Sequence, residues 1–311
     1  RKMLANPKEE YTRQLLSVRT LTEDKDLSVS EKDVILKVEG VTASYTGKEI
    51  VLEDIDLKIR RGRTVALVGE SGSGKSTLAR VITGLLPPLK GKTVYDGEML
   101  PPALKNRKRD SLRVMQMIYQ MPDTALNPRQ RVSKIIGRPL QFYYGMRGKA
   151  AEDRVLELLD KIELSEKYKD RYPTELSGGE KQRICIARAL AAKPDLIICD
   201  EVTSALDQLV AEEILKLLRD LQNELKVSYL FITHDLATVK AISDEIVVML
   251  RGRIVEQGRK TDILTPPHHE YTELLLDSVP EMDPDWLDGV LAERARKIAQ
   301  GIEVKTTFIE E

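Results

Sequence analysis

Residues 69–77 read Gly-Glu-Ser-Gly-Ser-Gly-Lys-Ser-Thr, which is a complete G-x-x-x-x-G-K-[ST] phosphate loop. In such a loop the glycines let backbone N–H groups surround phosphate oxygens, and the helix that follows adds partial positive charge at its N-terminus. The motif places Lys75 at the β- and γ-phosphate oxygens and the Ser76 hydroxyl on Mg²⁺. The loop predicts nucleoside triphosphate binding but leaves many families of NTPase open.

The neighbouring residues supply the strand and the helix that this loop requires. Thr64–Val68 is a short continuous apolar run, as expected for a strand buried on both faces of a parallel sheet, and a helix is expected from about Lys75. The alternation of strands and helices along the chain predicts an α/β fold with a mainly parallel core sheet. Further strands are expected at residues 34–39, 50–59, 114–119, 196–199, 229–233 and 245–250, and helical patterns at 132–168 and 210–225.

The acidic pair Asp200 and Glu201 directly follows the strand expected at residues 196–199. A carboxylate at the end of such a strand can hold Mg²⁺ through water, which predicts Asp200 as a metal-binding residue. Glu201 is predicted to orient and deprotonate the attacking water. A bare carboxylate is a weak base at neutral pH, so this role depends on the position of Glu201 and on its charged surroundings.

Composition limits the kind of protein this chain can be. Its 311 residues carry a net charge of −1, which gives no support for a strongly basic nucleic-acid surface. No run of about 18 apolar residues is present, and residues 1–7 lack the apolar core of a signal peptide. The only two cysteines, Cys185 and Cys199, fall in expected core elements, so a reducing cytoplasm fits better than a disulfide framework.

A second motif, Leu176-Ser-Gly-Gly-Glu-Lys-Gln182, resembles the signature of the ATP-binding subunits of ABC transporters. The resemblance implies that Ser177, Gly178 and Gly179 lie at a helix N-terminus and bind the γ-phosphate of ATP held by a partner domain. Neither ATP site is then complete in a monomer. The resemblance also implies an antiparallel β subdomain and an inserted helical signature subdomain, over about residues 125–185.

Four further positions match motifs of the same family. Gln120 resembles the glutamine that joins Mg²⁺ to the transmembrane coupling surface, and His234 resembles the switch histidine that contacts the γ-phosphate. Tyr45 resembles the aromatic residue that stacks on adenine, although a surface tyrosine in a turn is the plainer alternative. Asp207, in Ser204-Ala-Leu-Asp207, resembles the loop that communicates across the dimer.

The motifs and the resemblance together imply ATP and Mg²⁺ as cofactors. The catalytic residues are then Glu201, His234 and Lys75. The metal-binding residues are Ser76, Gln120 and Asp200. The nucleotide-contacting residues are Tyr45, Gly69, Ser71, Gly72, Gly74, Lys75, Ser76, Thr77, Gln120, Ser177, Gly178, Gly179 and Asp207.

Two segments point to one branch of the family. Asn127-Pro128-Arg129 is similar to a segment of oligopeptide, dipeptide and nickel importers, and the tail from Pro266 to Pro280 resembles their C-terminal extension. The resemblance implies an ATPase domain over residues 31–262 and an extension over residues 263–311.

The first residues of the chain repeat part of that tail. Residues 7–16 and 267–276 share identical residues at a constant spacing of roughly one ATPase domain. We expect residues 1–30 to be a linker or the tail of a preceding ATPase domain, which would make this chain the C-terminal half of a tandem protein. A chance similarity between two helices is the alternative. The identical pairs are Pro7/Pro267, Glu10/Glu270, Tyr11/Tyr271, Thr12/Thr272, Leu15/Leu275 and Leu16/Leu276.

The implied function is ATP-driven import of a peptide or a similar small solute. The implied partners are a second ABC ATPase domain, fused or separate, two transmembrane permease subunits and, indirectly, a periplasmic or extracellular solute-binding protein, with no nucleic acid. The chain would lie on the cytoplasmic side of the inner membrane as a peripheral subunit. The alternatives are a soluble ABC ATPase without permeases, such as a translation or repair factor, and a component of a carbon–phosphorus-lyase-type complex.

Overall fold

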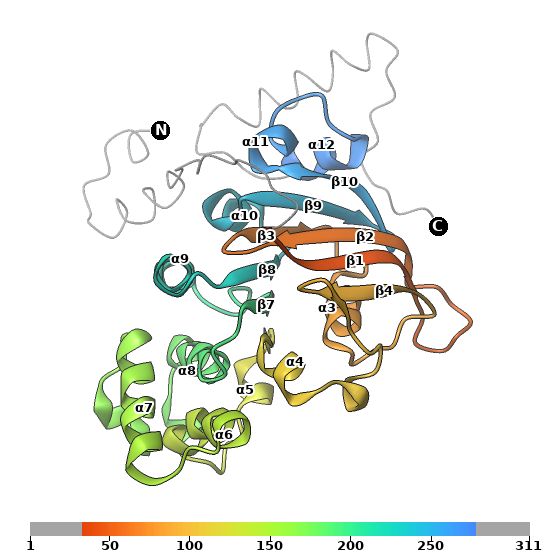
Figure 1. Ribbon diagram of the computed structural model, residues 1–311. Coiled ribbons are helices and arrows are strands. Elements are labelled where there is room, and N and C mark those ends of the chain that lie inside the picture. Colours follow the sequence, from red (N-terminus) through yellow and green to blue (C-terminus); the bar gives the residue numbers. More distant parts are fainter. Residues whose placement is uncertain (1–32, 278–311) are drawn as a thin grey trace, which may run out of the picture.

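The computed structural model describes residues 33–277, and its centre is a six-stranded sheet in the order β10-β9-β3-β8-β7-β6 (Figure 1). All neighbouring strands of this sheet are parallel except β10, which pairs antiparallel with β9. The prediction of a mainly parallel core is therefore confirmed. The strands are β3 (Thr64–Val68), β6 (Met115–Ile118), β7 (Leu196–Asp200), β8 (Ser228–Ile232), β9 (Glu245–Leu250) and β10 (Arg253–Arg259).

A second, antiparallel sheet has the strand order β2-β1-β4-β5. Its first strand continues past the expected end at residue 39, because a shift in register next to Gly40, at φ +56°, lets the chain remain extended. The expected end of this strand at residue 39 is wrong for this reason. The strands are β1 (Val34–Ala43), β2 (Leu52–Arg60), β4 (Lys90–Tyr95) and β5 (Glu98–Met99).

Helices surround the main sheet and form a separate lobe beyond β6 and β7, where Figure 1 shows α6, α7 and α8 together. The helical pattern expected over residues 132–168 is divided, because Gly145 adopts φ +67° and ends α6. The helices are α3 (Lys75–Thr83), α4 (Arg109–Arg113), α5 (Pro122–Ala125), α6 (Val132–Tyr144), α7 (Gly148–Lys161), α8 (Gly178–Leu190), α9 (Gln208–Leu225), α10 (Leu236–Ile242), α11 (Lys260–Ile263) and α12 (Glu270–Asp277), with 3₁₀ segments at Leu104–Asn106, Glu166–Asp170 and Pro173–Glu175.

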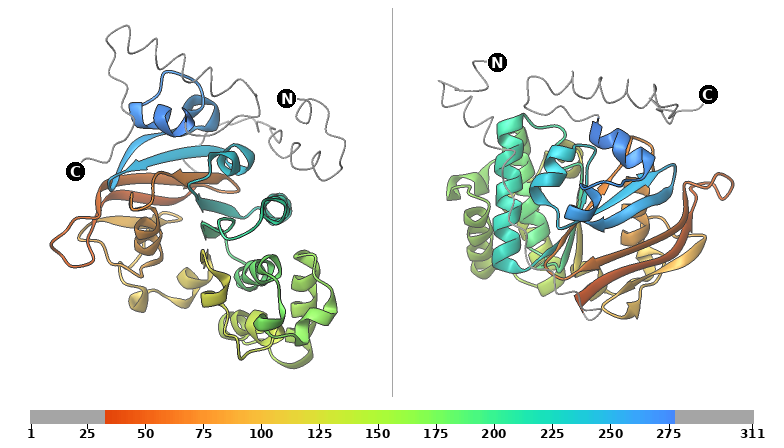
Figure 2. Two further views of the ribbon diagram at one scale, coloured as in Figure 1. Left: turned by 180° about the vertical axis from the view of Figure 1, so that it is seen from behind. Right: turned by 90° about the horizontal axis from the view of Figure 1, so that it is seen from above.

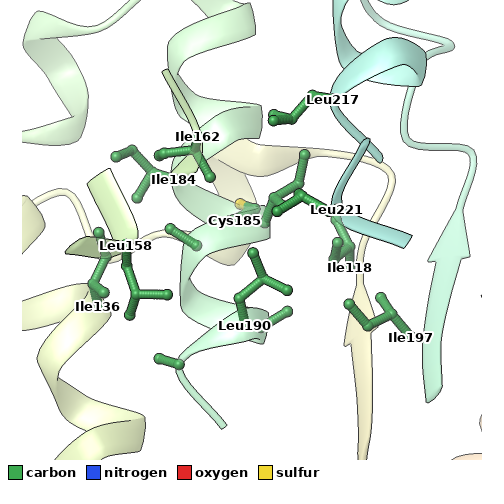
Figure 3. Packing of buried hydrophobic residues seen from close by; sticks show 14 of the residues in the cluster. Ile118, Ile136, Leu158, Ile162, Ile184, Cys185, Leu190, Ile197, Leu217 and Leu221 are labelled. Atoms are coloured by element: carbon green, nitrogen blue, oxygen red, sulfur yellow. The ribbon is translucent and has the colours of Figure 1, made fainter. Parts of the chain in front are cut away.

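Both faces of the main sheet are buried, which explains the continuous apolar runs of β7 and β8. Within β7, Ile197 packs toward the helical lobe while Ile198 packs toward α3 and the antiparallel sheet. Figure 2 shows these layers from behind and from above. Figure 3 shows how α8 packs with its neighbours through a cluster that contains Ile118, Ile136, Leu158, Ile162, Ile184, Cys185, Leu190, Ile197, Leu217 and Leu221.

Three other expectations can be compared with residues 33–277. Cys185 and Cys199 are buried and unpaired, as predicted. The segment 101–113 is rich in Lys and Arg, which predicts exposure, but Arg107 is buried and its guanidinium donates to the carbonyls of Pro101 and Ile82. No helix in the described part of the chain is both long enough and apolar enough to cross a membrane. The repeat at residues 7–16 lies outside the described residues.

Candidate functional site

The phosphate loop connects β3 to α3, as the sequence predicts. Gly69, Gly72 and Gly74 all adopt positive φ angles. At Gly69 a Cβ atom would lie 2.2 Å from the Met249 carbonyl oxygen, so only glycine fits there. Gly74 precedes α3 without a side-chain cap, which leaves the first N–H groups of the helix available to an anion.

Lys75 folds over this loop rather than pointing into solvent. Its Nζ donates to the carbonyl oxygens of Gly69 and Glu70, at 2.8 and 2.7 Å, and contacts the Ser73 hydroxyl at 3.4 Å. The side chain is buried, and burial lowers the pKa of Lys75 against the raising effects of Glu201 and Asp200. The loop therefore encloses a positive charge that its own carbonyl groups compensate.

Asp200 ends β7 next to the first turn of α3. Its Oδ1 accepts a hydrogen bond from the Ser76 hydroxyl at 3.0 Å. The carboxylate is 9% exposed, and this burial raises the pKa of Asp200, while the bond from Ser76 opposes the rise. Ser76 and Asp200, which are both predicted to hold the metal, thus lie side by side.

Glu201 directly follows β7 and contacts residues at or just after the ends of the neighbouring strands β6 and β8. Its backbone adopts φ +49°, and its N–H donates to the Ile232 carbonyl at the end of β8. One carboxylate oxygen accepts from Gln120 Nε2 at 2.8 Å, and the other lies 3.5 Å from His234 Nδ1. The positive φ of a glutamate is uncommon and is found here at a predicted catalytic position.

These contacts bring the predicted phosphate-binding and catalytic residues to one edge of the main sheet. Asp200 is the last residue of β7, and Lys75 and His234 follow β3 and β8. All three therefore lie at the carboxyl ends of parallel strands, where α/β folds present their ligand sites. His234 is the most open of these residues, with its side chain 60% exposed. The edge is therefore accessible from solvent.

Tyr45 lies beside α3 and is about half exposed. Its hydroxyl is 3.2 Å from the Thr77 hydroxyl and accepts a hydrogen bond from Arg80 Nη1 at 3.0 Å. Arg80 belongs to no sequence motif, although it follows Thr77 by about one turn of the helix that begins at the phosphate loop. An open aromatic ring next to this loop can stack on a planar base.

The signature residues lie at the start of α8, as predicted. Ser177 caps the helix and forms a capping box with Glu180. Tyr168 donates to Glu180 at 2.5 Å, and this bond lowers the pKa of Glu180. Within residues 33–277, no hydrogen bond or ion pair joins Ser177 or Gly178 to the phosphate loop, and both residues are exposed.

The first turn of α8 packs tightly against the start of α9. A Cβ atom at Gly179 would lie 2.5 Å from Val210 Cγ1, so the two helices approach too closely for any side chain there. Asp207 caps α9 by accepting from the Val210 N–H at 3.1 Å. The carboxylate of Asp207 thus has a structural role in this chain.

The donor set fits a triphosphate with a divalent cation. The loop offers uncapped N–H groups and an ammonium group for phosphate oxygens, and Ser76, Asp200 and Gln120 offer the hard oxygen atoms that Mg²⁺ prefers. At Gly72 a Cβ atom would meet nothing within 4 Å, so the loop is open on that side.

Comparison with known proteins agrees with this geometry. The ABC transporter family profile matches residues 52–204, and the profile of the oligopeptide/dipeptide transporter C-terminal region matches residues 255–303. A putative peptide import ATP-binding protein of Brucella abortus is 41% identical over 273 residues, covering 85% of this chain and 82% of the relative. The dipeptide transport ATP-binding protein DppF of Escherichia coli is 42% identical over 238 residues, covering 75% and 70%.

Solved structures give the same result. One is cbiO1 of Clostridium perfringens, part of the ABC transporter complex cbiONQ, with a TM-score of 0.68, 31% identity and coverage of 75% of this chain and 91% of that one. Another is a dimeric ATP-binding cassette in a post-hydrolysis state with ADP and Pi, with a TM-score of 0.64, 31% identity and coverage of 72% and 98%. The chain therefore belongs to the ABC transporter family, in the group of oligopeptide and dipeptide importer ATPases. As a member of this family it binds and hydrolyses ATP.

Proposed function

We propose that the edge formed by Lys75, Asp200, Glu201, Gln120 and His234 is the ATP·Mg²⁺ site that powers solute import. The observation that carries the proposal is the direct bond from Gln120 to Glu201, because it joins the predicted metal ligand to the predicted base. When bound, Mg²⁺ supplies charge neutralisation at the phosphate oxygens, and Ser76, Asp200 and Gln120 would hold it. The remaining catalytic work is positioning and electrostatics.

Glu201 and His234 act on the attacking water in this proposal. The contact at 3.5 Å between His234 Nδ1 and the Glu201 carboxylate lets the two side chains orient one another. Lys75 would leave the carbonyl oxygens of Gly69 and Glu70 for the phosphate oxygens, which replaces two neutral acceptors by charged ones. Tyr45 would stack on adenine, with Thr77 and Arg80 beside it.

The signature supports a head-to-tail pair of cassettes. Ser177 and Gly178 are exposed at the N-terminus of the 13-residue helix α8, and no hydrogen bond or ion pair within residues 33–277 joins them to their own phosphate loop. In the proposed pair, each signature completes the ATP site of the other cassette. The second cassette is either another copy or a fused domain.

A hollow next to Gln120 is the proposed docking surface for the permeases. Its volume is about 660 Å³, and it lies between the end of α3, β6 and α6. Leu85, Leu104 and Tyr119 line it and remain exposed, which is the apolar surface that a partner helix would cover. Closure of the two cassettes would reach the permeases through this surface and the helical lobe.

The same proposal includes the limits of the domains and the location of the subunit in the cell. Residues 31–262 form the ATPase domain, residues 263–311 the C-terminal extension, and residues 1–30 a linker or the tail of a preceding ATPase domain. The glutathione import ATP-binding protein GsiA of Salmonella choleraesuis is 40% identical over 267 residues. This alignment covers 83% of the present chain and 43% of GsiA. A relative about twice as long as this chain supports a tandem arrangement. The subunit would act at the cytoplasmic face of the inner membrane.

The solute class is proposed to be peptides. The names of the relatives from Brucella abortus and Escherichia coli refer to peptide and dipeptide transport, and the C-terminal profile belongs to the same group. A solute-binding protein and two permeases would select the solute, with this chain supplying energy.

Phosphate release from ATP tests the assignment of the site. Glu201→Gln is expected to bind a fluorescent ATP analogue as tightly as the wild type and to hydrolyse ATP at least about 100-fold more slowly. Lys75→Ala is expected to lose binding. Unchanged hydrolysis in Glu201→Gln would refute the role of the glutamate, and capture of soluble enzymes in place of permeases by the tagged chain would refute the transport role.

A further inference from the structure

Tyr271 connects the C-terminal extension to the phosphate loop. It is the second residue of α12, which lies beside β9 and β10 at the periphery of the fold in Figures 1 and 2, yet its side chain is 0% exposed. Its hydroxyl oxygen accepts a hydrogen bond from the Glu70 N–H at 2.8 Å, across 201 positions of sequence. A residue outside the nucleotide motifs therefore contacts the second residue of the phosphate loop.

The peptide bond that Tyr271 holds is the first of the loop. The Glu70 N–H and the Gly69 carbonyl belong to one planar trans peptide, so they point in opposite directions. The carbonyl accepts from Lys75 Nζ at 2.8 Å. One peptide plane is thus fixed by Tyr271 on one side and by Lys75 on the other.

The surroundings leave this peptide little room to turn. Gly69 has φ +148°, and an added Cβ atom would lie 2.2 Å from the Met249 carbonyl oxygen on β9. The tyrosine ring packs in a buried cluster with Val68 of β3 and with Val239 of α10, the helix that follows His234. Because burial raises the pKa of Tyr271, its hydroxyl stays protonated and neutral near neutral pH.

We propose that Tyr271 is a positioning residue for ATP binding, which fixes the Gly69–Glu70 peptide through its hydroxyl. The proposal rests on the assignment of residues 69–77 as the phosphate site. When Lys75 turns to phosphate oxygens, the Gly69 carbonyl loses one of its supports, and the bond from Glu70 to Tyr271 remains. The C-terminal extension is then part of the nucleotide site and not only an appendage to it.

The test compares two buried tyrosines in the whole chain. Tyr271→Phe keeps the ring and leaves the Glu70 N–H without its acceptor. Tyr229→Phe is the matched control, since Tyr229 is also 0% exposed and its hydroxyl donates to the Leu218 carbonyl at 3.0 Å, away from the loop. Each change removes one buried hydrogen bond, so both variants should melt at similarly lowered temperatures.

The expected difference is in nucleotide binding. Tyr271→Phe should weaken binding of a fluorescent ATP analogue about 3- to 10-fold, which is the loss of one buried hydrogen bond, while Tyr229→Phe should leave it unchanged. The KM for ATP should rise with it, and kcat at saturating ATP should stay within about twofold, because the tyrosine touches no reacting atom. Equal ATP affinity in the two variants would overturn the proposal.

Two further measurements separate the causes. If Lys75→Ala bound the analogue as the wild type does, the assignment of the phosphate site would be wrong. If Lys75→Ala lost binding while Tyr271→Phe kept it, only the role of Tyr271 would fail. Should Tyr271→Phe not fold, amide hydrogen exchange of the wild type decides: protection of the Glu70 amide with and without ATP supports the anchor, and exchange at the rate of an open loop refutes it.

Discussion

The close contact between α8 and α9 predicts how much a substitution in the signature lowers the free energy of unfolding. In Gly179→Ala, the new Cβ atom would lie 2.5 Å from Val210 Cγ1, well inside van der Waals contact. A valine in a helix has one strongly preferred rotamer, so its methyl group cannot turn away and the helices must separate. Overpacking of this kind costs about 1–3 kcal/mol, partly offset by about 0.5–1 kcal/mol from replacing a helical glycine.

Gly178→Ala is the matched control for that substitution. Its Cβ atom would lie 3.5 Å from Leu206 Cδ2, which is ordinary contact, so this variant is expected to be neutral or slightly stabilised. Both glycines lie in the first turn of α8. The difference in unfolding free energy between the two variants therefore isolates the close approach to α9.

Urea unfolding followed by circular dichroism measures the effect, and a second substitution tests its cause. Val210→Ala removes the clashing methyl group, and the next atom, Val210 Cβ, would lie 3.8 Å away. We expect Gly179→Ala/Val210→Ala to recover about 1–3 kcal/mol relative to the sum of the single changes. Unfolding of Gly179→Ala at the same urea concentration as Gly178→Ala would refute the predicted clash. An equal effect of Val210→Ala on the unfolding free energy of the wild type and of Gly179→Ala would refute it as well.

Two further predictions concern buried titratable groups. Burial raises the pKa of Asp200, so the ionised carboxylate destabilises the folded chain relative to the protonated one. This destabilisation is absent below the unfolded pKa, about 4, and is complete once pH has risen through the folded pKa. Asp200→Asn should therefore melt at a higher temperature than the wild type at pH 7, with the gain vanishing below about pH 4, and should hydrolyse ATP at least about 100-fold more slowly; an unchanged melting temperature at pH 7 would contradict this. Burial also raises the pKa of Cys185 to about 11 and that of Cys199 further, so a thiol reagent should modify neither in the native chain and both after denaturation; rapid labelling of the folded chain would contradict the burial.

The sequence predicted best where one physical signal dominates. The strands β3, β7, β8 and β9 are continuous apolar runs because both faces of the central sheet are covered, and all were expected within a residue or two. The strands β4 and β10 were missed, because they lie at or near sheet edges and carry lysine, arginine and glutamate. Their strand state depends on pairing with a neighbour, which no local pattern contains.

The residues of the site likewise fall into those that a local motif predicts and those that only the fold brings together. Lys75, Ser76 and Asp200 belong to local motifs, and the structure brings them together where the order of the strands requires. Tyr271 contacts Glu70 only because α12 packs on β3 and β9, far along the chain, and no motif marks that contact. The basic neighbours of Arg107 indicate an exposed segment, whereas its burial depends on two carbonyl groups that only the fold supplies.

In the proposed pair, ATP joins two cassettes, with the signature of each completing the site of the other. Light scattering of Glu201→Gln, with and without ATP·Mg²⁺, tests it most directly, since a second copy carries the same two half-sites as any partner cassette. We expect a shift from the 35.2 kDa of one chain to twice that mass with ATP. We also expect Glu201→Gln/Ser177→Arg to bind ATP and to remain at 35.2 kDa. A Glu201→Gln chain that is saturated with ATP and still has the mass of one chain would contradict pairing between two copies of this chain.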